Sequence, residues 1–241
     1  MNMITNQLIK KIGNQCGAEL CGIASVDRFK KAPSGFHPKD IYPPTRSVIV
    51  FARRIPDSGF ASRSPVPYTF LTTLTLNEVY QLTMRMVREL ENLDVIGVPV
   101  PSEPYECWNR RTRTGKGILS LRHAGHLAGM GAIGKNHLLT NHQYGNRITL
   151  GAILTDIKLS SDPIDHEPAC PPGCKVCRTV CPVKAIRDEG VIQKLCRSRA
   201  EGFNEKGYYL YWCRACREKC PNSKGEKRET KNPPTERGFE H

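Results

Sequence analysis

Several features are absent from this 241-residue sequence, and each absence narrows the class of protein. No apolar run reaches the length of about 20 residues that crosses a membrane, so no membrane partner is expected. The opening residues MNMITNQLIKKIGNQ contain neither the apolar stretch of a signal peptide nor a twin-arginine leader. The sequence therefore predicts a cytoplasmic protein.

Acidic residues are scarce relative to basic ones. The chain has 36 Lys and Arg against 23 Asp and Glu, which gives a formal net charge of +13. A basic balance permits acidic partners such as RNA, nucleotides or an acidic redox protein, but it does not select among them.

Cysteine, in contrast, is abundant. There are 11 cysteines, and most of them lie in CPPGCKVCRTVCP at 170–182, in CRACREKCP at 213–221, or at Cys196 between these two motifs. So many thiols in a chain expected to stay in a reducing compartment indicate metal binding rather than disulfides. Cys16, Cys21 and Cys107 match no motif and are expected to be small buried or free thiols.

The two motifs are an internal duplication that ends in Cys-Pro each time. In the bacterial ferredoxin pattern, three closely spaced thiolates bind one iron–sulfur cluster and the thiolate before the proline binds the other. Two 4Fe–4S clusters are therefore predicted. The predicted ligands are Cys170, Cys174, Cys177 and Cys220 for the first cluster, and Cys181, Cys196, Cys213 and Cys216 for the second.

Two structural zinc sites are the alternative, because CxxC pairs also form zinc ribbons. Zinc sites would not account for the proline that follows the last cysteine of each motif. They would also not account for eight cysteines that divide into two sets of four when the motifs exchange a ligand. Cys170 departs from the usual spacing, since PPG separates it from Cys174. Without Cys170, the first site would have three thiolates and an open iron.

The remaining chain alternates predicted helices and strands, which indicates a mixed α/β domain. Helices are predicted at 5–15, at 77–93 with Asn77 as N-cap, and at 118–127; strands are predicted at 20–26, 47–55, 94–100 and 144–156. The segment SSDPIDHEP at 160–168 is rich in proline and acids and marks a boundary. The predicted organisation is a cofactor-binding domain at 1–160, a cluster domain at 161–221 and a flexible basic tail at 222–241.

A glycine-rich stretch precedes the last predicted strand of the first domain. Gly129, Gly131 and Gly134 satisfy GxGxxG, and Gly129 to Lys135 fits GxxxxGK. The segment before it looks helical rather than extended, and Asn136 stands where a Walker loop has Ser or Thr, so neither nucleotide motif is supported. Three glycines this close together still indicate that the backbone lies close against a flat or bulky group.

Two further features have ordinary explanations beside functional ones. The basic loop PSEPYECWNRRTRTGKG at 101–117 suits a lid or a substrate contact through Trp108, but such stretches are more often solvated surface loops. Four histidines, namely His123, His126, His137 and His142, follow no known metal-site spacing and are expected to be surface or packed side chains.

The segment AGMGAIGKNHLLTNHQYGNRITLGAILTD at 128–156, followed by the two cysteine motifs around Cys196, resembles the epoxyqueuosine reductase family. That family is in turn related to the corrinoid part of reductive dehalogenases. The resemblance implies an α/β (α+β) fold, with a nitroreductase-like sandwich domain that binds cobalamin and a two-cluster, ferredoxin-like domain. Electrons would pass through the clusters to cobalt.

The same resemblance suggests roles for particular residues. Glu78, in LTLNEVYQL, takes the position of the family's proton-donating acid, although its place in a first helical turn would also explain it. Gly129, Gly131, Gly134 and Lys135 would lie against the corrinoid. A ferredoxin or flavodoxin would donate electrons.

The substrate implied by the resemblance is a small molecule or a modified nucleoside. Family members carry helical repeats after the ferredoxin domain that help to grip tRNA, and this chain ends about 20 residues after its last cysteine. tRNA is therefore expected only as a weaker candidate. A ferredoxin-like electron carrier without its own substrate, and a flavin-binding reductase, are the two alternatives.

Overall fold

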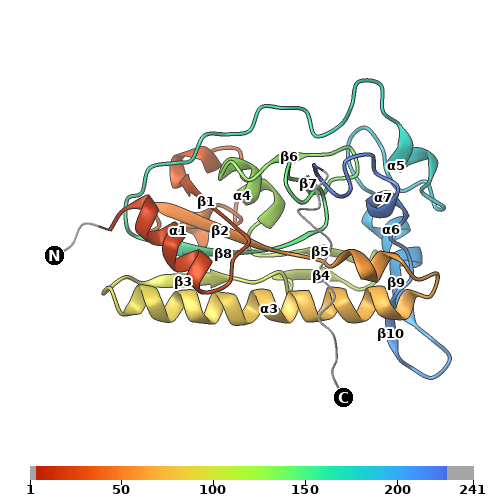
Figure 1. The fold of residues 1–241 in the computed structure, drawn as a ribbon, viewed down its shortest axis with the longest axis horizontal. Helices are drawn as coiled ribbons and strands as arrows, with labels where there is room; N and C mark the ends of the chain where they lie inside the picture. Colours follow the sequence, from red (N-terminus) through yellow and green to blue (C-terminus); the bar gives the residue numbers. More distant parts are fainter. Residues whose placement is uncertain (1–3, 227–241) are drawn as a thin grey trace, which may run out of the picture.

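The computed structural model describes residues 4–226, and a four-stranded sheet lies at its centre (Figure 1). The strands are β1 (Leu20–Ser25), β2 (Ser47–Arg54), β8 (Ile148–Thr155) and β3 (Gly97–Val100). They stand in the order β1-β2-β8-β3, and every neighbouring pair is antiparallel. The mixed α/β class expected from the sequence is confirmed.

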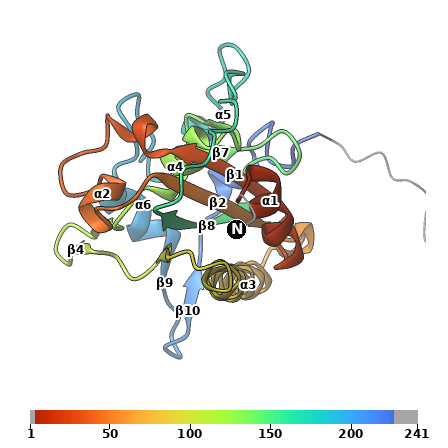
Figure 2. The same cartoon turned by 90° about the vertical axis from the view of Figure 1, so that its left-hand side faces the viewer.

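Both faces of the sheet are covered by helices, which explains why β2 is a nearly continuous apolar run. Because side chains alternate along a strand, Val48, Val50 and Ala52 face one core while Ile49 and Phe51 face the other. Helices α1 (Asn6–Gln15) and α3 (Pro65–Glu91) pack on the Phe51 side, and α4 (Leu121–Leu127) packs on the opposite side (Figure 2).

Helix α3 begins much earlier than the sequence pattern predicts. Ser64 is its N-cap, with a hydroxyl that accepts a hydrogen bond from the Val66 N–H at 3.2 Å, and Pro65 opens the first turn. The expected N-cap, Asn77, lies inside the helix, so that prediction is wrong. Tyr68, near the start of α3, packs against Phe60 and Tyr211. These contacts join α3 to the cysteine-rich region.

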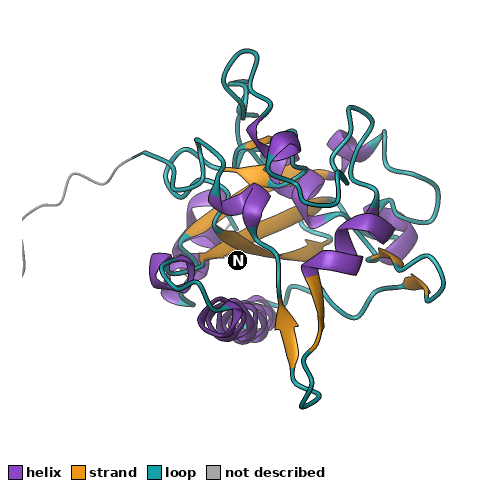
Figure 3. Ribbon diagram, turned by 90° about the vertical axis from the view of Figure 1, so that its right-hand side faces the viewer, coloured by secondary structure: helices purple, strands orange, loops and turns teal. Residues whose placement is uncertain are grey.

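The cysteine-rich region consists of short elements with a small apolar core. It contains α5 (Val176–Thr179), α6 (Gln193–Ala200), α7 (Ala215–Glu218) and the hairpin of β9 (Glu201–Phe203) and β10 (Tyr209–Tyr211), which projects past α3 (Figure 3). Its buried apolar side chains are Cys177, Ala185, Ile186 and Leu210. Polar contacts and the thiols therefore carry much of its organisation.

The remaining elements are short. They are η1 (Val26–Phe29), α2 (Pro38–Ile41), η2 (Asp57–Phe60), the paired strands β4 (Cys107–Asn109) and β5 (Thr114–Lys116), and the paired strands β6 (Ala132–Ile133) and β7 (Leu139–Thr140). Within residues 4–226, no helix combines the length and the apolar character needed to span a bilayer.

The predicted boundary segment is attached to the first domain at its start. Asp162 accepts hydrogen bonds from the Ile23 N–H at 2.9 Å and from Lys10 at 2.7 Å. The first residues of the predicted tail are also held in place, since the Ser223 hydroxyl accepts a hydrogen bond from the Arg147 Nε at 2.9 Å. A flexible tail from residue 222 is therefore wrong for 222–226, and residues 227–241 lie outside the described residues.

Candidate functional site: two groups of thiols

The two duplicated cysteine motifs adopt the same backbone conformation. In each, the middle cysteine of the shared CxxCxxxCP run lies at the second position of a four-residue helix, Cys177 in α5 and Cys216 in α7. The residues before these helices have nearly the same dihedral angles, with φ −126° and ψ 7° at Lys175 and φ −130° and ψ 12° at Arg214. The repeat seen in the sequence is thus a structural repeat.

Four thiols surround one pocket between the cysteine-rich region and the β6–β7 turn. They are Cys170, Cys174, Cys177 and Cys220, and we call them the first thiol group. Burial raises the pKa of Cys220, and the thiols of Cys170, Cys174 and Cys177 raise it further. Cys220 comes from the second motif, so the group crosses the two motifs.

We call Cys181, Cys196, Cys213 and Cys216 the second thiol group, because the first three lie near enough to Cys216 to influence its pKa. Burial raises the pKa of Cys216 to about 11, with further contributions from the thiols of Cys196, Cys213 and Cys181. Burial also raises the pKa of Cys196, as do Cys181 and Cys213. A metal that binds thiols in place of their protons contributes its binding free energy to folding.

Backbone N–H groups point at sulfur atoms in both groups. The Lys135 N–H donates to the Sγ of Cys170 at 3.4 Å, and the Ala185 N–H donates to the Sγ of Cys181 at 3.2 Å. Such bonds favour the thiolate form that binds iron. The donor set, four thiols with backbone N–H support, fits a 4Fe–4S cluster in each group.

In the described part of the chain, no three His, Cys, Asp or Glu side chains converge on a position for one metal ion. The histidines have other partners: His142 pairs with Asp165 at 3.0 Å, and His126 Nδ1 lies 2.9 Å from the Gly131 carbonyl oxygen. Burial and then the nearby Arg122 lower the pKa of His123 and of His137.

The glycine stretch packs against the protein itself. A Cβ at Gly129 would lie 2.1 Å from the Pro163 carbonyl oxygen, and a Cβ at Gly131 would lie 2.2 Å from that of Thr140. Both glycines also have positive φ, 72° and 142°. Close backbone contacts thus explain these two glycines, and the seat for a corrinoid ring expected there stays a prediction.

Gly134 and Lys135 have a different setting, because both line the pocket of the first thiol group. The Lys135 Nζ donates a hydrogen bond to the carbonyl oxygen of Cys174 at 2.8 Å. Asn136 follows them, is 6% exposed and also lines this pocket. Sequence reasoning treated Asn136 only as a departure from a Walker loop, and its contacts were not foreseeable from motif spacing.

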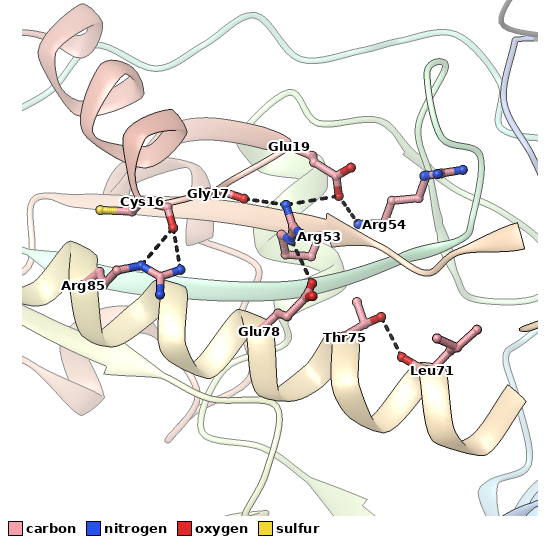
Figure 4. A network of polar contacts seen from close by, with 9 residues as sticks. All are labelled: Cys16, Gly17, Glu19, Arg53, Arg54, Leu71, Thr75, Glu78 and Arg85. Carbon is pink, nitrogen blue, oxygen red and sulfur yellow. Dashed lines mark hydrogen bonds and ion pairs between the residues drawn. The ribbon is translucent and has the colours of Figure 1, made fainter. Parts of the chain in front are cut away.

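Glu78 lies in the middle of α3 and forms an ion pair with Arg53 of β2, with Oε2 and Nε 3.0 Å apart (Figure 4). Arg53 also donates to the Gly17 carbonyl oxygen at 2.9 Å. The side chain of Glu78 is 53% exposed. The expected position in the first turn of a helix is therefore wrong. Glu78 ties α3 to Arg53 of β2, and Arg53 in turn contacts the turn after α1.

The basic loop at 101–117 contains the β4–β5 hairpin, which docks on α6. Trp108 stacks on Tyr105, and the guanidinium of Arg197 lies 5.0 Å from the centroid of each ring. Gln193 exchanges two hydrogen bonds with the backbone of Gly115, at 2.9 and 3.2 Å. The loop is thus anchored beside Cys196 rather than free in solvent.

Comparison with known proteins points to one family. No protein-family model matches the chain. Over 109 residues it is 33% identical to an epoxyqueuosine reductase of Lactococcus garvieae, covering 41% of this chain and 30% of the relative. With the enzyme of Vibrio cholerae, identity is 27% over 257 aligned positions, covering 90% of this chain and 66% of the relative. Over these stretches the chain is similar to epoxyqueuosine reductases.

Solved structures show the shared fold. An epoxyqueuosine reductase from Streptococcus thermophilus superimposes with a TM-score of 0.64 at 17% identity, covering 94% of this chain and 68% of that one. A B12-dependent reductive dehalogenase gives 0.63 at 17% identity, covering 92% and 32%. The chain spans about a third of the length of several curated epoxyqueuosine reductases that it matches.

Proposed function

We propose that this chain is an iron–sulfur reductase that holds two 4Fe–4S clusters in its two thiol groups. The observation that carries the proposal is the grouping of eight thiols into two sets of four, each set drawn from both motifs. The similarity to epoxyqueuosine reductases supports it. The proposed organisation is a nitroreductase-like domain at 1–160 and a ferredoxin-like domain at 161–221, after which residues 222–226 return to the first domain at Arg147.

The protein's own residues would hold and shield the clusters. The thiolates provide four ligands to each cluster, and the N–H groups of Lys135 and Ala185 stabilise negative charge on sulfur. When bound, the clusters carry single electrons. A ferredoxin or a flavodoxin is the proposed donor, because an acidic carrier complements a chain of net charge +13.

Cobalamin is the proposed terminal reducing centre, and this rests on the likeness to epoxyqueuosine reductases and to a dehalogenase described as B12-dependent. The proposed substrate is a modified nucleoside of the epoxyqueuosine class in tRNA, since one relative's structure contains an epoxyqueuosine-modified tRNA stem loop. The sequence led us to expect a small molecule or a modified nucleoside, with tRNA only as a weaker candidate; the relative's structure moves tRNA to first place.

Anaerobic reconstitution tests the cluster sites. Wild-type protein should bind about eight irons, Cys170→Ser should lose iron, and Cys107→Ser, whose thiol is exposed and outside both groups, should match the wild type. Two zinc ions in place of iron would overturn the proposal.

Cobalamin and substrate are tested next with the loaded protein. Retained cobalt with an EPR signal supports the corrinoid. Release of a yellow chromophore on unfolding would indicate a flavin instead. If the protein holds neither cobalt nor flavin, it is an electron carrier. Reduction of an epoxyqueuosine-containing stem loop, but not of a halogenated phenol, would establish the substrate class.

The same assay tests Glu78 as the proton donor suggested by the family. Glu78 is half-exposed and paired with Arg53, so we expect Glu78→Gln to leave turnover unchanged and to alter the free energy of unfolding by less than about 1 kcal/mol. A loss of turnover of about 100-fold or more, at full cluster content, would instead assign Glu78 as the acid.

A further inference from the structure

Asn136 is a buried side chain that contacts both thiol groups. It lies in the turn between β6 and β7 and lines the pocket of the first group. Its Nδ2 donates a hydrogen bond to the carbonyl oxygen of Cys216, in the second group, at 3.1 Å. A single amide from the first domain thus reaches both places where clusters are proposed.

The same amide also shapes the turn that carries it. Its Oδ1 accepts a hydrogen bond from the Leu138 N–H at 3.2 Å, which closes a side-chain-to-backbone turn two residues long. Directly before Asn136, the Lys135 N–H donates to the Sγ of Cys170 at 3.4 Å. The turn closed by Asn136 therefore begins one residue after the N–H that points at the sulfur.

We propose that Asn136 is a positioning residue that sets the relation between the two clusters. It keeps the Lys135 N–H on the Cys170 sulfur and ties that turn to the backbone of Cys216. This inference rests on the proposed function, because it presumes that clusters occupy the thiol groups. An N–H directed at sulfur stabilises the reduced, more negative cluster, so losing it lowers the reduction potential.

Two variants separate the two roles of the amide. Asn136→Ala removes both the acceptor for Leu138 and the donor to Cys216. Asn136→Ser keeps a short neutral acceptor that can close the same turn, but it is too short to reach Cys216. Asn141→Ala is the matched control, since Asn141 accepts from the Gln143 N–H at 2.8 Å and donates to the Met130 carbonyl oxygen at 2.7 Å. Neither of these partners belongs to a thiol group.

Redox titration followed by EPR reads out the effect in loaded protein. The first cluster's signal is the one that Cys170→Ser changes. Asn136→Ala should lower the midpoint potential of that cluster and change the magnetic interaction between the reduced clusters. Asn136→Ser should change the interaction with little shift of the first potential, and Asn141→Ala should change neither. Unchanged potentials and interaction in Asn136→Ala at full iron content would overturn the proposal.

Hydrogen exchange in cluster-free protein provides a readout independent of the clusters. Because the hydrogen bond from the Leu138 N–H to Asn136 lies within the β6–β7 turn, Asn136→Ala should speed exchange of the Leu138 amide, and Asn136→Ser should do so less. If the wild type binds no clusters, the proposed function fails while this effect persists. If exchange in Asn136→Ala equals that of the wild type, the positioning role itself is wrong.

Discussion

The three cysteines outside the thiol groups differ strongly in their surroundings. Burial raises the pKa of Cys21 to about 12, and burial likewise raises that of Cys16, whereas Cys107 is exposed at the start of β4. At pH 8, a thiol with a pKa of about 12 is ionised in only about one molecule in ten thousand. Reactivity at these three positions should therefore differ widely.

Loaded protein treated with iodoacetamide at pH 8 should be modified rapidly at Cys107 and only after unfolding at Cys16 and Cys21. Peptide mass spectrometry measures the order of labelling. Cys107→Ser should take up almost no label in the folded state. Equal rates at Cys21 and Cys107 would show that the core around Cys21 opens readily.

Gly151 allows Phe51 to fill the core on the α3 side of the sheet. A Cβ at Gly151 would lie 2.5 Å from Cε2 of Phe51 and 2.9 Å from Cγ1 of Val79. We expect Gly151→Ala to lower the free energy of unfolding by about 1–3 kcal/mol, because the added methyl group overpacks a filled core. Urea denaturation measures the change.

Gly117→Ala is the control for this substitution, since its Cβ would come no closer than 3.6 Å to a neighbouring atom. Its free energy of unfolding should stay close to that of the wild type. A Gly151→Ala protein as stable as Gly117→Ala would mean that the Phe51 ring moves aside without loss.

At the scale of elements, the β4–β5 hairpin depends on α6. Arg197 lies over the rings of Tyr105 and Trp108 and donates a hydrogen bond to the Tyr105 hydroxyl at 2.8 Å. We expect Arg197→Gln to accelerate amide exchange across residues 105–116 by several-fold, because cation–π contacts of about 0.5–1 kcal/mol each are lost. The central sheet should exchange as before.

Arg110→Gln is a suitable comparison, because Arg110 is an exposed arginine of the same hairpin. It removes one positive charge without removing the stacked guanidinium. If both variants accelerate exchange equally, net charge rather than stacking holds the hairpin.

At the scale of the whole molecule, the two regions have different sources of stability. The sheet is buried on both faces, whereas the segment 170–221 buries few apolar side chains. A structural metal site contributes its binding free energy to folding. The cysteine-rich region is therefore expected to depend on its clusters far more than the sheet does.

Removal of iron with a chelator should make residues 170–221 exchange rapidly while β2 and β8 remain protected. Hydrogen exchange followed by mass spectrometry, with and without clusters, measures both regions in one sample. Equal loss of protection in β2 would show that the two regions unfold as one unit.

Local patterns in the sequence determined much of this protein. The bounds of the central strands and of α1 were predicted within a few residues. The spacing of their apolar residues distinguishes a buried strand from a helix with one buried face. The duplicated cysteine spacing predicted two sets of four thiols. The thiols predicted for the first set line one pocket, and the assignment of both sets to clusters stays a prediction. Ligand spacing is a local property, so it can be read from the chain.

Only the tertiary structure decided the other features of the fold and the site, because the residues that contact one another there are far apart in the sequence. The first turns of α3 lack a buried stripe and are supported instead by Tyr211, and Gly131 is required by the carbonyl oxygen of Thr140. Glu78 meets Arg53 across two elements, and Asn136 meets Cys216 across 80 residues. Such contacts follow from how the sheet, helices and turns pack, which no local pattern encodes.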